Sequence, residues 1–370
     1  MFRVGINALY IKWGVNAGTE TYFTNIVKPW YLKNQTDVAF TLYCNEPPPW
    51  WVAEKTHFNI KIFPNAKNLK HRLFIEQILF PFSLNKQHDV LFNPGYVGSL
   101  CLQTPQVTTI HDGFAWVHPK EIGLLRSIYW RTFIPLTARR ARKIIAVSKN
   151  TAQDIKQFCG INQDKIEVIY EGGGHYNKNY NSNILNRLNV DKHSYFHCLG
   201  FFKNIKNPFR ILEAFKHFKE NSSSSVKLLL AGHVSGLDAQ KILEFALSID
   251  DVLYLGRISD EEVAELYENS LGLIFPSLYE GFGIPILEAQ SFNCPVVTSN
   301  TSAMPEIAGN GAILVDPLSV EDIEMAYGIL VNGQNKDLIK LGRINLENFS
   351  WNKASDQTLA VLQGLDEKGF

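Results

Sequence analysis

The chain lacks several features that would place it in a specialised class of protein. Its five cysteines are odd in number, stand far apart and show no C-x-x-C spacing, so neither a disulfide framework nor a zinc site is indicated. It contains no run of about 18 consecutive apolar residues, as a membrane-spanning helix would need. The N-terminus enters an apolar strand-like run at residues 2–6 without a charged leader, and a cytoplasmic location is therefore the expectation.

An excess of one charge is also missing, since 36 basic residues balance 36 acidic ones. The balance conceals a division, because residues 1–150 hold 18 Lys and Arg against 8 Asp and Glu, whereas residues 151–370 hold 18 against 28. A basic first half suits a phosphorylated or membrane-borne partner, although ordinary solvated faces show the same asymmetry. No recognised nucleic-acid-binding motif accompanies these bases, so nucleic acid is not an expected partner.

Short apolar runs alternate with amphipathic stretches, which is typical of the βα units of a parallel sheet. In the second half the expected strands are residues 196–202, 226–231, 252–255, 271–275, 295–299 and 312–315. In the first half they are residues 2–8, 38–44, 90–93, 107–111, 143–147 and 166–170. Because 370 residues exceed what one core usually supports, the pattern predicts an α/β fold with two domains. The polar run NKNYNSNILN at residues 177–186 is the predicted boundary.

The stretch FPSLYEGFGIPILE at residues 275–288 carries the most informative pattern. Between Glu280 and Glu288, two glycines permit a tight loop and a proline suits the first turn of a helix. Both carboxylates are thus expected at the carboxyl end of a strand, where open α/β sheets bind ligands. Backbone N–H groups at the helix start suit a diphosphate, and carboxylates accept hydrogen bonds from sugar or ribose hydroxyls. On spacing alone, a simple turn with a surface glutamate explains the segment equally well.

The segment from Ser277 to Pro317 resembles, almost position by position, the E-x7-E block of the retaining glycosyltransferases of family 4. Weaker similarities are IHDGFAWVHP from Ile110, IIAVSKNTAQDI from Ile144 and LGFFKNIKNPFRILEAF from Leu199. The resemblance covers most of the chain and implies the GT-B fold, in which two Rossmann-like domains with parallel sheets face an interdomain cleft. It implies an acceptor-binding domain at residues 1–185, a nucleotide-sugar-binding domain at 186–347, and a segment at 348–370 that crosses back to the first domain.

The resemblance also implies how the donor is held. Glu280 would contact the transferred sugar and act as a catalytic residue, and Glu288 would contact the ribose. Further donor contacts are expected from the loop around them, at Tyr279, Gly281, Phe282, Gly283 and Ile284.

A basic pair on the donor diphosphate is a second family feature, commonly within a G-x4-R-K-N string. The string reads GFFKNIKN here, so Lys206 and Asn207 match, but Ile205 stands where the arginine is expected. A departing nucleoside diphosphate builds negative charge that a positioned cation stabilises. Lys206 is therefore an expected catalytic residue. Lys203 is the preferred second cation, and Arg210 in the following helix is a weaker candidate.

The first domain contributes two weaker candidates. The glycine-containing loop GVNAGTETY at residues 14–22 resembles the family's loop after the first strand, and makes Gly18 and Thr19 expected donor contacts. Glycines between a strand and a helix are nevertheless common. His111 in the family-like IHD string is expected to line the sugar site as a catalytic residue, whereas Asp112 is expected to orient the loop or contact the acceptor.

The stretch RSIYWRTFIPLTARRARK at residues 126–143 has two interpretations. It is either an amphipathic face that meets anionic lipid or a lipid-linked acceptor, or a core-packed helix with a solvated basic end. The second is slightly favoured, because Pro135 argues against one uninterrupted surface helix. A basic and apolar run at residues 67–82 keeps peripheral membrane contact, at the inner face of the membrane, as an expectation.

Together, the residues and the resemblance predict a retaining, hexosyltransferase-type enzyme that moves a sugar from a nucleotide-sugar donor to a hydroxyl acceptor. The acceptor would be a sugar, a glycolipid or a lipid-linked sugar in surface-polysaccharide assembly. No cofactor or metal is expected, because no D-x-D pair stands near a strand end. A GT-B nucleotide-sugar epimerase and a GT-B binding subunit without activity are the alternatives. An oxidoreductase is disfavoured, since no strand is followed by a complete G-x-G-x-x-G.

Overall fold

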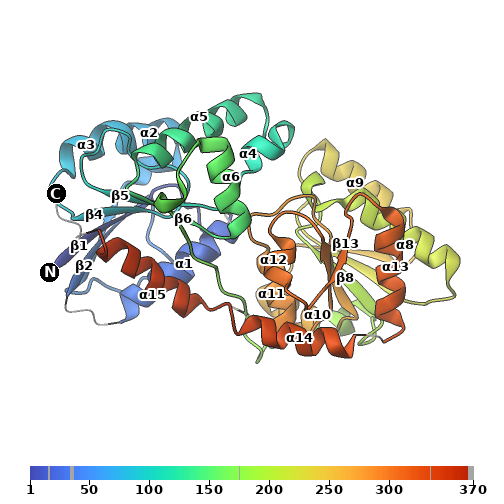
Figure 1. The fold of residues 1–370 in the computed structure, drawn as a ribbon. Helices are drawn as coiled ribbons and strands as arrows, with labels where there is room; N and C mark the ends of the chain where they lie inside the picture. The colour runs from blue at the N-terminus through green and yellow to red at the C-terminus, as the bar shows by residue number, and fades with distance from the viewer. Residues whose placement is uncertain (16, 34–36, 175, 334, 366–370) are drawn as a thin grey trace. The chain divides into compact units, whose positions relative to one another are not determined.

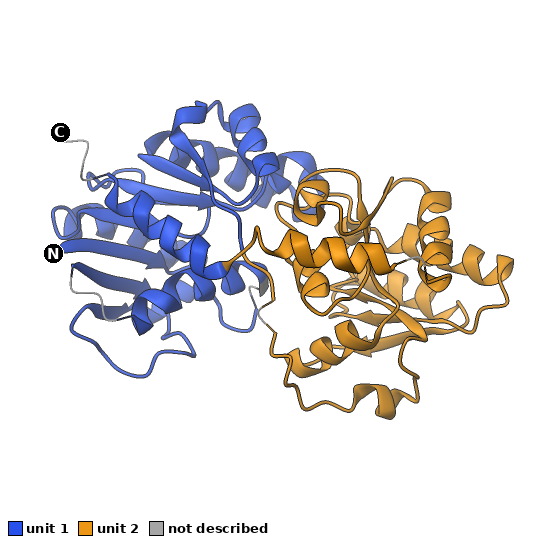
Figure 2. Cartoon of the chain, turned by 60° about the horizontal axis from the view of Figure 1, so that its bottom comes forward, with its two compact units in different colours: residues 1–171, 351–370 blue, residues 172–350 orange. Residues whose placement is uncertain are grey.

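The computed structural model describes residues 1–15, 17–33, 37–174, 176–333 and 335–365. The chain divides into two compact units, shown in blue and orange in Figure 2. Unit 1 comprises residues 1–171 and 351–370, and unit 2 comprises residues 172–350.

Unit 1 contains a seven-stranded sheet in the order β3-β2-β1-β4-β5-β6-β7, with every neighbouring pair parallel. Its strands are β1 Phe2–Ala8, β2 Val38–Cys44, β3 Phe58–Ile62, β4 Val90–Asn93, β5 Gln106–Ile110, β6 Lys143–Ala146 and β7 Ile166–Val168. The longer helices are α1 Ala17–Leu32, α5 Leu124–Arg140, α6 Lys149–Cys159 and α15 Trp351–Gln363. The shorter helices are α2 Leu69–Phe74, a π-helix at Ile75–Leu79, α3 Phe80–Ser83 and α4 Phe114–Val117. The order reverses between β1 and β4.

Unit 2 contains a six-stranded parallel sheet in the order β10-β9-β8-β11-β12-β13. Its strands are β8 Tyr195–Leu199, β9 Lys227–Ala231, β10 Val252–Gly256, β11 Gly272–Phe275, β12 Val296–Ser299 and β13 Ile313–Val315. Its helices are α7 Ile184–Leu188, α8 Pro208–Asn221, α9 Leu237–Leu247, α10 Asp260–Asn269, α11 Ile284–Ser291, α12 Met304–Ala308, α13 Val320–Val331 and α14 Lys336–Leu346. The order reverses between β8 and β11. The two parallel sheets confirm the predicted α/β architecture.

The apolar runs of the sequence become strands because they lie between layers of helices, as Figure 1 shows for each unit. In unit 1 every residue of β4 and β5 is buried, including the polar Asn93, Gln106 and Thr108. These three satisfy one another, since the Asn93 side-chain amide donates to Gln106 Oε1 at 3.1 Å and to Thr108 Oγ1 at 3.2 Å. Side-chain capping defines helix starts in both units, as in α10, where Ser259 and Glu262 form a capping box.

The division between the units differs from the predicted boundaries. The first lies between Glu171 and Gly172, so the predicted limit at 185/186 falls inside unit 2. The reason is that the polar run ends in α7, whose Ile184 and Leu185 pack in a buried cluster with Tyr195 of β8. The predicted segment 348–370 starts too early, since unit 2 extends to Ser350.

The last helix belongs to unit 1, and Figure 1 shows α15 in red beside α1 in blue. The buried Ser355 hydroxyl donates to the Ile26 carbonyl at 2.8 Å, and Lys33 pairs with Asp356 at 2.9 Å. The chain therefore leaves unit 1 after Glu171 and returns to it at Trp351.

Helix α5 contains most of the basic and apolar stretch at residues 126–143. The helix runs through Pro135 without a break, and Pro135 lies on its buried face together with Ile134 and Ala138. The opposite face exposes Leu125 and Ile128. In the part of the chain that the structure describes, no helix is both long and apolar enough to cross a bilayer.

Candidate active site

The candidate site of unit 2 lies where β8 and β11 pair and the strand order reverses. The segments that follow these two strands are the 3₁₀ turn Asn204–Lys206 and the loop before α11. They are joined by a backbone hydrogen bond in which Leu278 N–H donates to the Ile205 carbonyl at 2.8 Å. Because ligands of open α/β sheets bind at such reversals, beyond the carboxyl ends of the strands, this position is where a ligand is expected.

Lys206 and Glu280 meet there as an ion pair. Lys206 Nζ lies 2.6 Å from Glu280 Oε1, and the two side chains are 20% and 19% exposed. The same ammonium group lies 4.4 Å from the centroid of the Phe275 ring, at the end of β11. The Glu280 backbone is fixed by Ser302, whose Oγ accepts from Glu280 N–H at 3.0 Å. The first glutamate of the E-x7-E pattern is thus held beside a cation by contacts from three segments.

Lys203 is the neighbouring cation. It is exposed as a residue, yet desolvation around its ammonium group lowers the pKa of Lys203, and the nearby charge of Lys206 lowers it further. The Glu280 carboxylate acts in the opposite direction. These influences place Lys203 within electrostatic range of the Lys206–Glu280 pair, whereas Arg210 donates to Asn207 Oδ1 at 3.2 Å.

Asn207 shows why the lysine is followed by asparagine. It is buried, adopts the left-handed conformation with φ of 61°, and its amide donates to the carbonyls of Pro276 at 3.2 Å and Pro317 at 2.6 Å. An asparagine tolerates this conformation and supplies two donors at once. Asn207 therefore holds together the segments that follow β8, β11 and β13.

Glu288 lies in α11 and is 4% exposed. Tyr267 OH donates to its Oε2 at 2.8 Å. Burial raises the pKa of Glu288 to about 7, while the Tyr267 hydrogen bond and the Lys206 charge act against this rise. One lysine therefore acts on both glutamates of the pattern, although only Glu280 pairs with it directly.

The aromatic side chains of the loop around Glu280 are buried. Tyr279 and Phe282 are buried, and the Phe282 ring lies 6.0 Å from that of Phe349. Gly283 has φ of 107°, which an L side chain rarely adopts, and it precedes the first helical residue, Ile284. Gly281 is half-buried between them. These residues fix the backbone that presents Glu280.

In unit 1, His111 follows β5 and is almost fully buried. Its Nε2 lies 2.8 Å from the Pro94 carbonyl, and because a carbonyl only accepts, Nε2 carries the proton. Its Nδ1 lies 3.6 Å from Glu171 Oε1. Burial raises the pKa of Glu171, and His111 opposes this rise. The Tyr22 ring packs edge-on at 4.7 Å. Both ring nitrogens of His111 therefore face protein groups.

The remaining predicted residues of unit 1 lie at loop and helix starts. Asp112 accepts from Tyr96 OH at 2.5 Å and from Phe114 N–H at 2.9 Å, so it orients the loop after β5. Gly18 and Thr19 lie in the first turn of α1. A side chain at Gly18 would meet no atom of the described residues within 4 Å, so local packing does not require a glycine there.

Two family models match successive parts of the chain. The model described as Glycosyltransferase Family 4 matches residues 32–172, and the model of the group 1 glycosyl transferases matches residues 183–338. Together they cover most of the chain. The chain belongs to glycosyltransferase family 4.

Curated relatives of this chain include several mannosyltransferases. It is 28% identical to the O-antigen chain mannosyltransferase RfbU of Salmonella typhimurium over 57% of each chain. It is 29% identical to O-antigen chain mannosyltransferase B of Escherichia coli over 68% of each chain. It is 26% identical to the MMP alpha-(1->4)-mannosyltransferase of Mycolicibacterium hassiacum over 70% of this chain and 65% of the relative. The chain thus spans little more than half of the first relative and about two thirds of the other two.

Solved structures resemble this chain along its whole length. A glycosyltransferase of Rickettsia africae matches with a TM-score of 0.73 at 15% identity, covering 100% of this chain and 99% of the other. HepE of Anabaena, solved with UDP-glucose, matches with a TM-score of 0.71 at 16% identity, covering 98% and 100%. WaaG, involved in lipopolysaccharide biosynthesis, matches with a TM-score of 0.70 at 16% identity, covering 98% and 100%. At these identities the likeness establishes the GT-B fold alone.

The sequence alone did not indicate several residues that support the candidate site. Tyr267 bonds Glu288, Ser302 fixes the Glu280 backbone, and Glu171 faces His111. Each pair is joined by the fold across a long stretch of sequence, so spacing gave no signal. A signal did exist for Phe275, the last residue of a predicted strand directly before the E-x7-E loop.

Proposed function

We propose that the chain transfers a sugar from a nucleotide-sugar donor to a hydroxyl acceptor, and that unit 2 holds the donor diphosphate beyond β8 and β11. The observation that carries the proposal is the Lys206–Glu280 ion pair at the reversal of the strand order. Membership of family 4 supports the same placement.

Lys206 stabilises the leaving diphosphate in this mechanism. Without donor its charge is balanced by Glu280, so the arriving phosphates compete for an ammonium group that is already oriented and mostly shielded from water. Negative charge builds on the diphosphate as the glycosidic bond breaks. The contact between Lys206 and the diphosphate is therefore stronger in the transition state than in the ground state, which lowers the barrier. Lys203 supplies the second positive charge in place of the arginine that Ile205 replaces. With this charge the reaction proceeds without a metal.

The carboxylates and the neighbouring residues then orient the donor. Once the phosphates share Lys206 with it, Glu280 accepts a hydrogen bond from a hydroxyl of the transferred sugar. Glu288 accepts a hydrogen bond from a ribose hydroxyl. The buried loop from Tyr279 to Ile284 keeps Glu280 in place. Donor contacts of His111, Gly18 and Thr19 are proposed from family membership alone. Retention of the anomeric configuration is proposed from family membership.

Mannose is the sugar that the relatives favour, because RfbU, mannosyltransferase B and the Mycolicibacterium enzyme are each described as mannosyltransferases. The first two act on O-antigen chains by name, which supports assembly of a surface polysaccharide on a sugar or glycolipid acceptor. Contact with the inner face of a membrane fits unit 1, where Phe82, Leu124 and Leu125 are highly exposed beside basic residues.

A thermal-shift panel of GDP-, UDP-, ADP- and dTDP-sugars tests the proposal, because a ligand bound only by the folded protein raises its Tm. We expect one nucleotide-sugar to raise the Tm of the wild type and to lose this effect with Lys206→Ala. Lys216→Ala is the matched control, since it removes an exposed lysine of α8 in the same unit. Equal shifts in wild type and Lys206→Ala would place the donor elsewhere.

A binding subunit without activity is the second candidate, and the observation that favours it is Ile205 at the arginine position. It would bind the donor in the panel but release no nucleoside diphosphate with any acceptor. An epimerase would convert the nucleotide-sugar alone into a new epimer without net transfer. Analysis of the products with and without acceptor therefore separates the three functions.

A further inference from the structure

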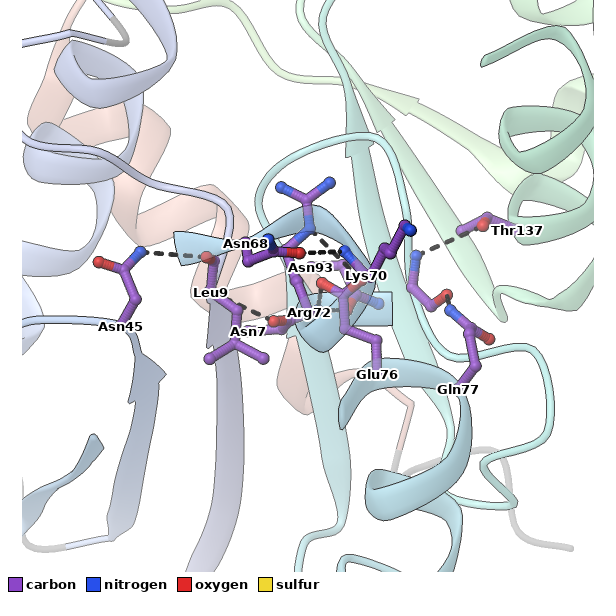
Figure 3. Close-up of polar contacts among 11 residues, drawn as sticks. Asn7, Leu9, Asn45, Asn68, Lys70, Arg72, Glu76, Gln77, Asn93 and Thr137 are labelled. Atoms are coloured by element: carbon purple, nitrogen blue, oxygen red, sulfur yellow. Dashed lines mark hydrogen bonds and ion pairs between the residues drawn. The ribbon is translucent and has the colours of Figure 1, made fainter. Parts of the chain in front are cut away.

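Unit 1 has its own reversal of strand order, between β1 and β4, and a buried polar cluster lies there (Figure 3). Asn7 near the end of β1 donates through its amide to Asn93 Oδ1 and to Glu76 Oε1, each at 3.2 Å. Glu76 is 3% exposed and belongs to the π-helix that follows α2. A carboxyl group is thus buried at the position where an α/β sheet is expected to bind a ligand.

Four polar atoms around this carboxyl lack hydrogen-bond partners among the residues that the structure describes. They are Glu76 Oε2, Arg72 Nε, Tyr10 OH and Tyr129 OH, and all four are buried from solvent. Arg72 Nε lies 3.8 Å from Glu76 Oε2, which is an ion pair but too long for a hydrogen bond. Since buried polar groups are nearly always hydrogen-bonded, four such atoms around one carboxyl call for a physical explanation.

The four side chains, here named the Glu76 cluster, influence one another electrically. Burial raises the pKa of Glu76 to about 7, and Arg72 and the Asn7 hydrogen bond oppose this rise. Burial also raises the pKa of Tyr10 and of Tyr129, and the Arg72 charge acts against both rises. One cation therefore acts on all three groups, and its side chain also contacts the Tyr129 hydroxyl.

The residue next to Glu76 has both ends of its side-chain amide hydrogen-bonded. On the same π-helix, Gln77 donates to the Gly98 carbonyl at 3.0 Å and accepts from Leu100 N–H at 2.9 Å. Figure 3 shows the first of these contacts beside those of Glu76. The Tyr10 ring is packed so closely on Gly95 that a side chain there would collide with it. π-helical turns are rare in proteins, and those that occur are often found at functional sites.

The cluster reaches both the surface of unit 1 and the surroundings of His111. Arg72, Tyr10 and Tyr129 are each partly exposed. Tyr10 lies within electrostatic range of Tyr22, whose ring packs on His111. A ligand that binds at this surface would therefore contact these three side chains.

The chemistry of the cluster selects the class of ligand. Arg72 offers a donor, Glu76 an acceptor when ionised, and each tyrosine hydroxyl either role. A phosphate would gain from Arg72 but be repelled by an ionised Glu76. A neutral sugar suits the whole set, because its hydroxyls donate to the carboxylate and accept from the guanidinium group, while its C–H faces lie on the tyrosine rings.

We propose that Tyr10, Arg72, Glu76 and Tyr129 form a subsite that binds the hydroxyl groups of the acceptor sugar. This inference rests on the proposed function and names the residues that would recognise its second substrate. The four are positioning residues: they hold the acceptor by hydrogen bonds and do not take part in breaking the donor bond.

The test is steady-state transfer by the full chain, with its preferred nucleotide-sugar at saturation and methyl α-glycosides of mannose, galactose, glucose and N-acetylglucosamine as acceptors. For Glu76→Gln we expect the acceptor KM to rise at least tenfold with little change in kcat. For Tyr129→Phe, which removes only a hydroxyl, we expect a several-fold rise. Lys70→Gln is the control, because it removes an exposed charge from α2 and should leave the acceptor KM at the wild-type value.

Donor binding, measured by calorimetry, separates this inference from the proposed function. We expect all three variants to bind the donor with the wild-type Kd. If the wild type binds no nucleotide-sugar, the proposed function fails and the subsite fails with it. If the wild type transfers sugar and both cluster variants keep its acceptor KM, only the subsite is wrong. Inorganic phosphate that competes with the acceptor in the wild type but not in Arg72→Gln would show an anion site and overturn the assignment to a neutral sugar.

Discussion

Each unit has a cation and a glutamate near the reversal of its strand order, but the two side chains are closely paired in unit 2 and loosely paired in unit 1. In unit 2, Lys206 and Glu280 form a close pair at 2.6 Å. In unit 1, Arg72 and Glu76 are 3.8 Å apart, and atoms of both lack hydrogen bonds within the described structure. A closed ion pair suits a ligand whose phosphates can compete for the lysine. Unpaired donors and acceptors suit a ligand that supplies hydrogen bonds and no charge.

The buried carboxyls extend the comparison. Burial raises the pKa of both Glu288 and Glu76 to about 7. Glu288 receives a hydrogen bond from Tyr267 OH, whereas Glu76 Oε2 accepts none from the described residues. The same desolvation therefore leaves unit 2 with a satisfied carboxyl and unit 1 with an unsatisfied one.

The largest expected effect is that of Lys206→Ala on catalysis. Removing the cation that faces the leaving diphosphate should lower kcat/KM about 100- to 1,000-fold, by analogy with loss of one preorganised electrostatic contact. Lys206→Arg should recover part of the rate because it restores the charge. Initial rates measure the effect, with Lys216→Ala as control. A rate within threefold of the wild type would remove Lys206 from the mechanism.

Asn207→Ala should have the next largest effect, on the stability of unit 2. The substitution leaves the buried carbonyls of Pro276 and Pro317 without the donor and places alanine at a positive φ. We expect a loss of about 2–4 kcal/mol, measured as unfolding in urea. Asn221→Ala, which removes an exposed hydrogen bond from α8 of the same unit, should change stability by less than about 0.5 kcal/mol. Equal effects of the two substitutions would contradict the role assigned to Asn207.

The pH dependence of stability tests the unsatisfied carboxyl of unit 1. Because the folded-state pKa of Glu76 is raised from its ordinary 4.5 to about 7, the folded state binds more protons than the unfolded state between these values. Wild-type stability should therefore fall as pH rises through this window, by up to about 3 kcal/mol from this group. Arg72 and Tyr129 are the ionisable groups of the described chain that face Glu76.

Glu76→Gln removes this titration, so the Tm of the variant relative to wild type should rise between pH 5 and pH 8. Lys70→Gln serves again as control and should follow the wild type. Parallel Tm profiles of wild type and Glu76→Gln would mean that Glu76 does not titrate in this window.

The smallest effect is expected for the backbone of the E-x7-E loop. Gly283→Ala places a side chain at φ of 107°, with its Cβ 3.1 Å from Ile286 Cδ1, and should destabilise unit 2 by about 1–2 kcal/mol. Gly328→Ala in α13 is the opposite case, because a Cβ there meets nothing within 4 Å in the described structure and helix propensity favours alanine. Thermal unfolding should separate the two in sign, and a Gly283→Ala protein as stable as wild type would contradict the strain.

The sequence predicted the sheets better than the contacts around the sites. Long apolar runs such as residues 2–8 and 38–44 became strands because burial on both faces demands continuous apolar sequence. The edge strand β3 was missed, since its FNIKI sequence is largely exposed and carries a weak signal. The stretch around Pro135 forms a helix with a buried face, in keeping with the favoured interpretation, although the helix continues through the proline.

In the candidate sites, too, the local backbone was predicted and the long-range side-chain contacts were not. Glycine and proline spacing predicted the loop and helix start around Glu280, since backbone conformation is a local property. The partners of the glutamates are not local: Glu76 lies 69 residues from Asn7, and Glu288 lies 21 residues from Tyr267. Residues 75–79 read as an ordinary amphipathic run, and nothing in their spacing indicates a π-helix that buries a carboxyl.

The most direct test of the account is the Kd of the preferred nucleotide-sugar, measured by calorimetry for wild type, Lys206→Ala and Lys216→Ala. Since a hydrogen bond to a charged group contributes about 1.5–3 kcal/mol, the account predicts binding about 10- to 100-fold weaker in Lys206→Ala and unchanged in Lys216→Ala. The same Kd in all three proteins would contradict a donor site at the Lys206–Glu280 pair.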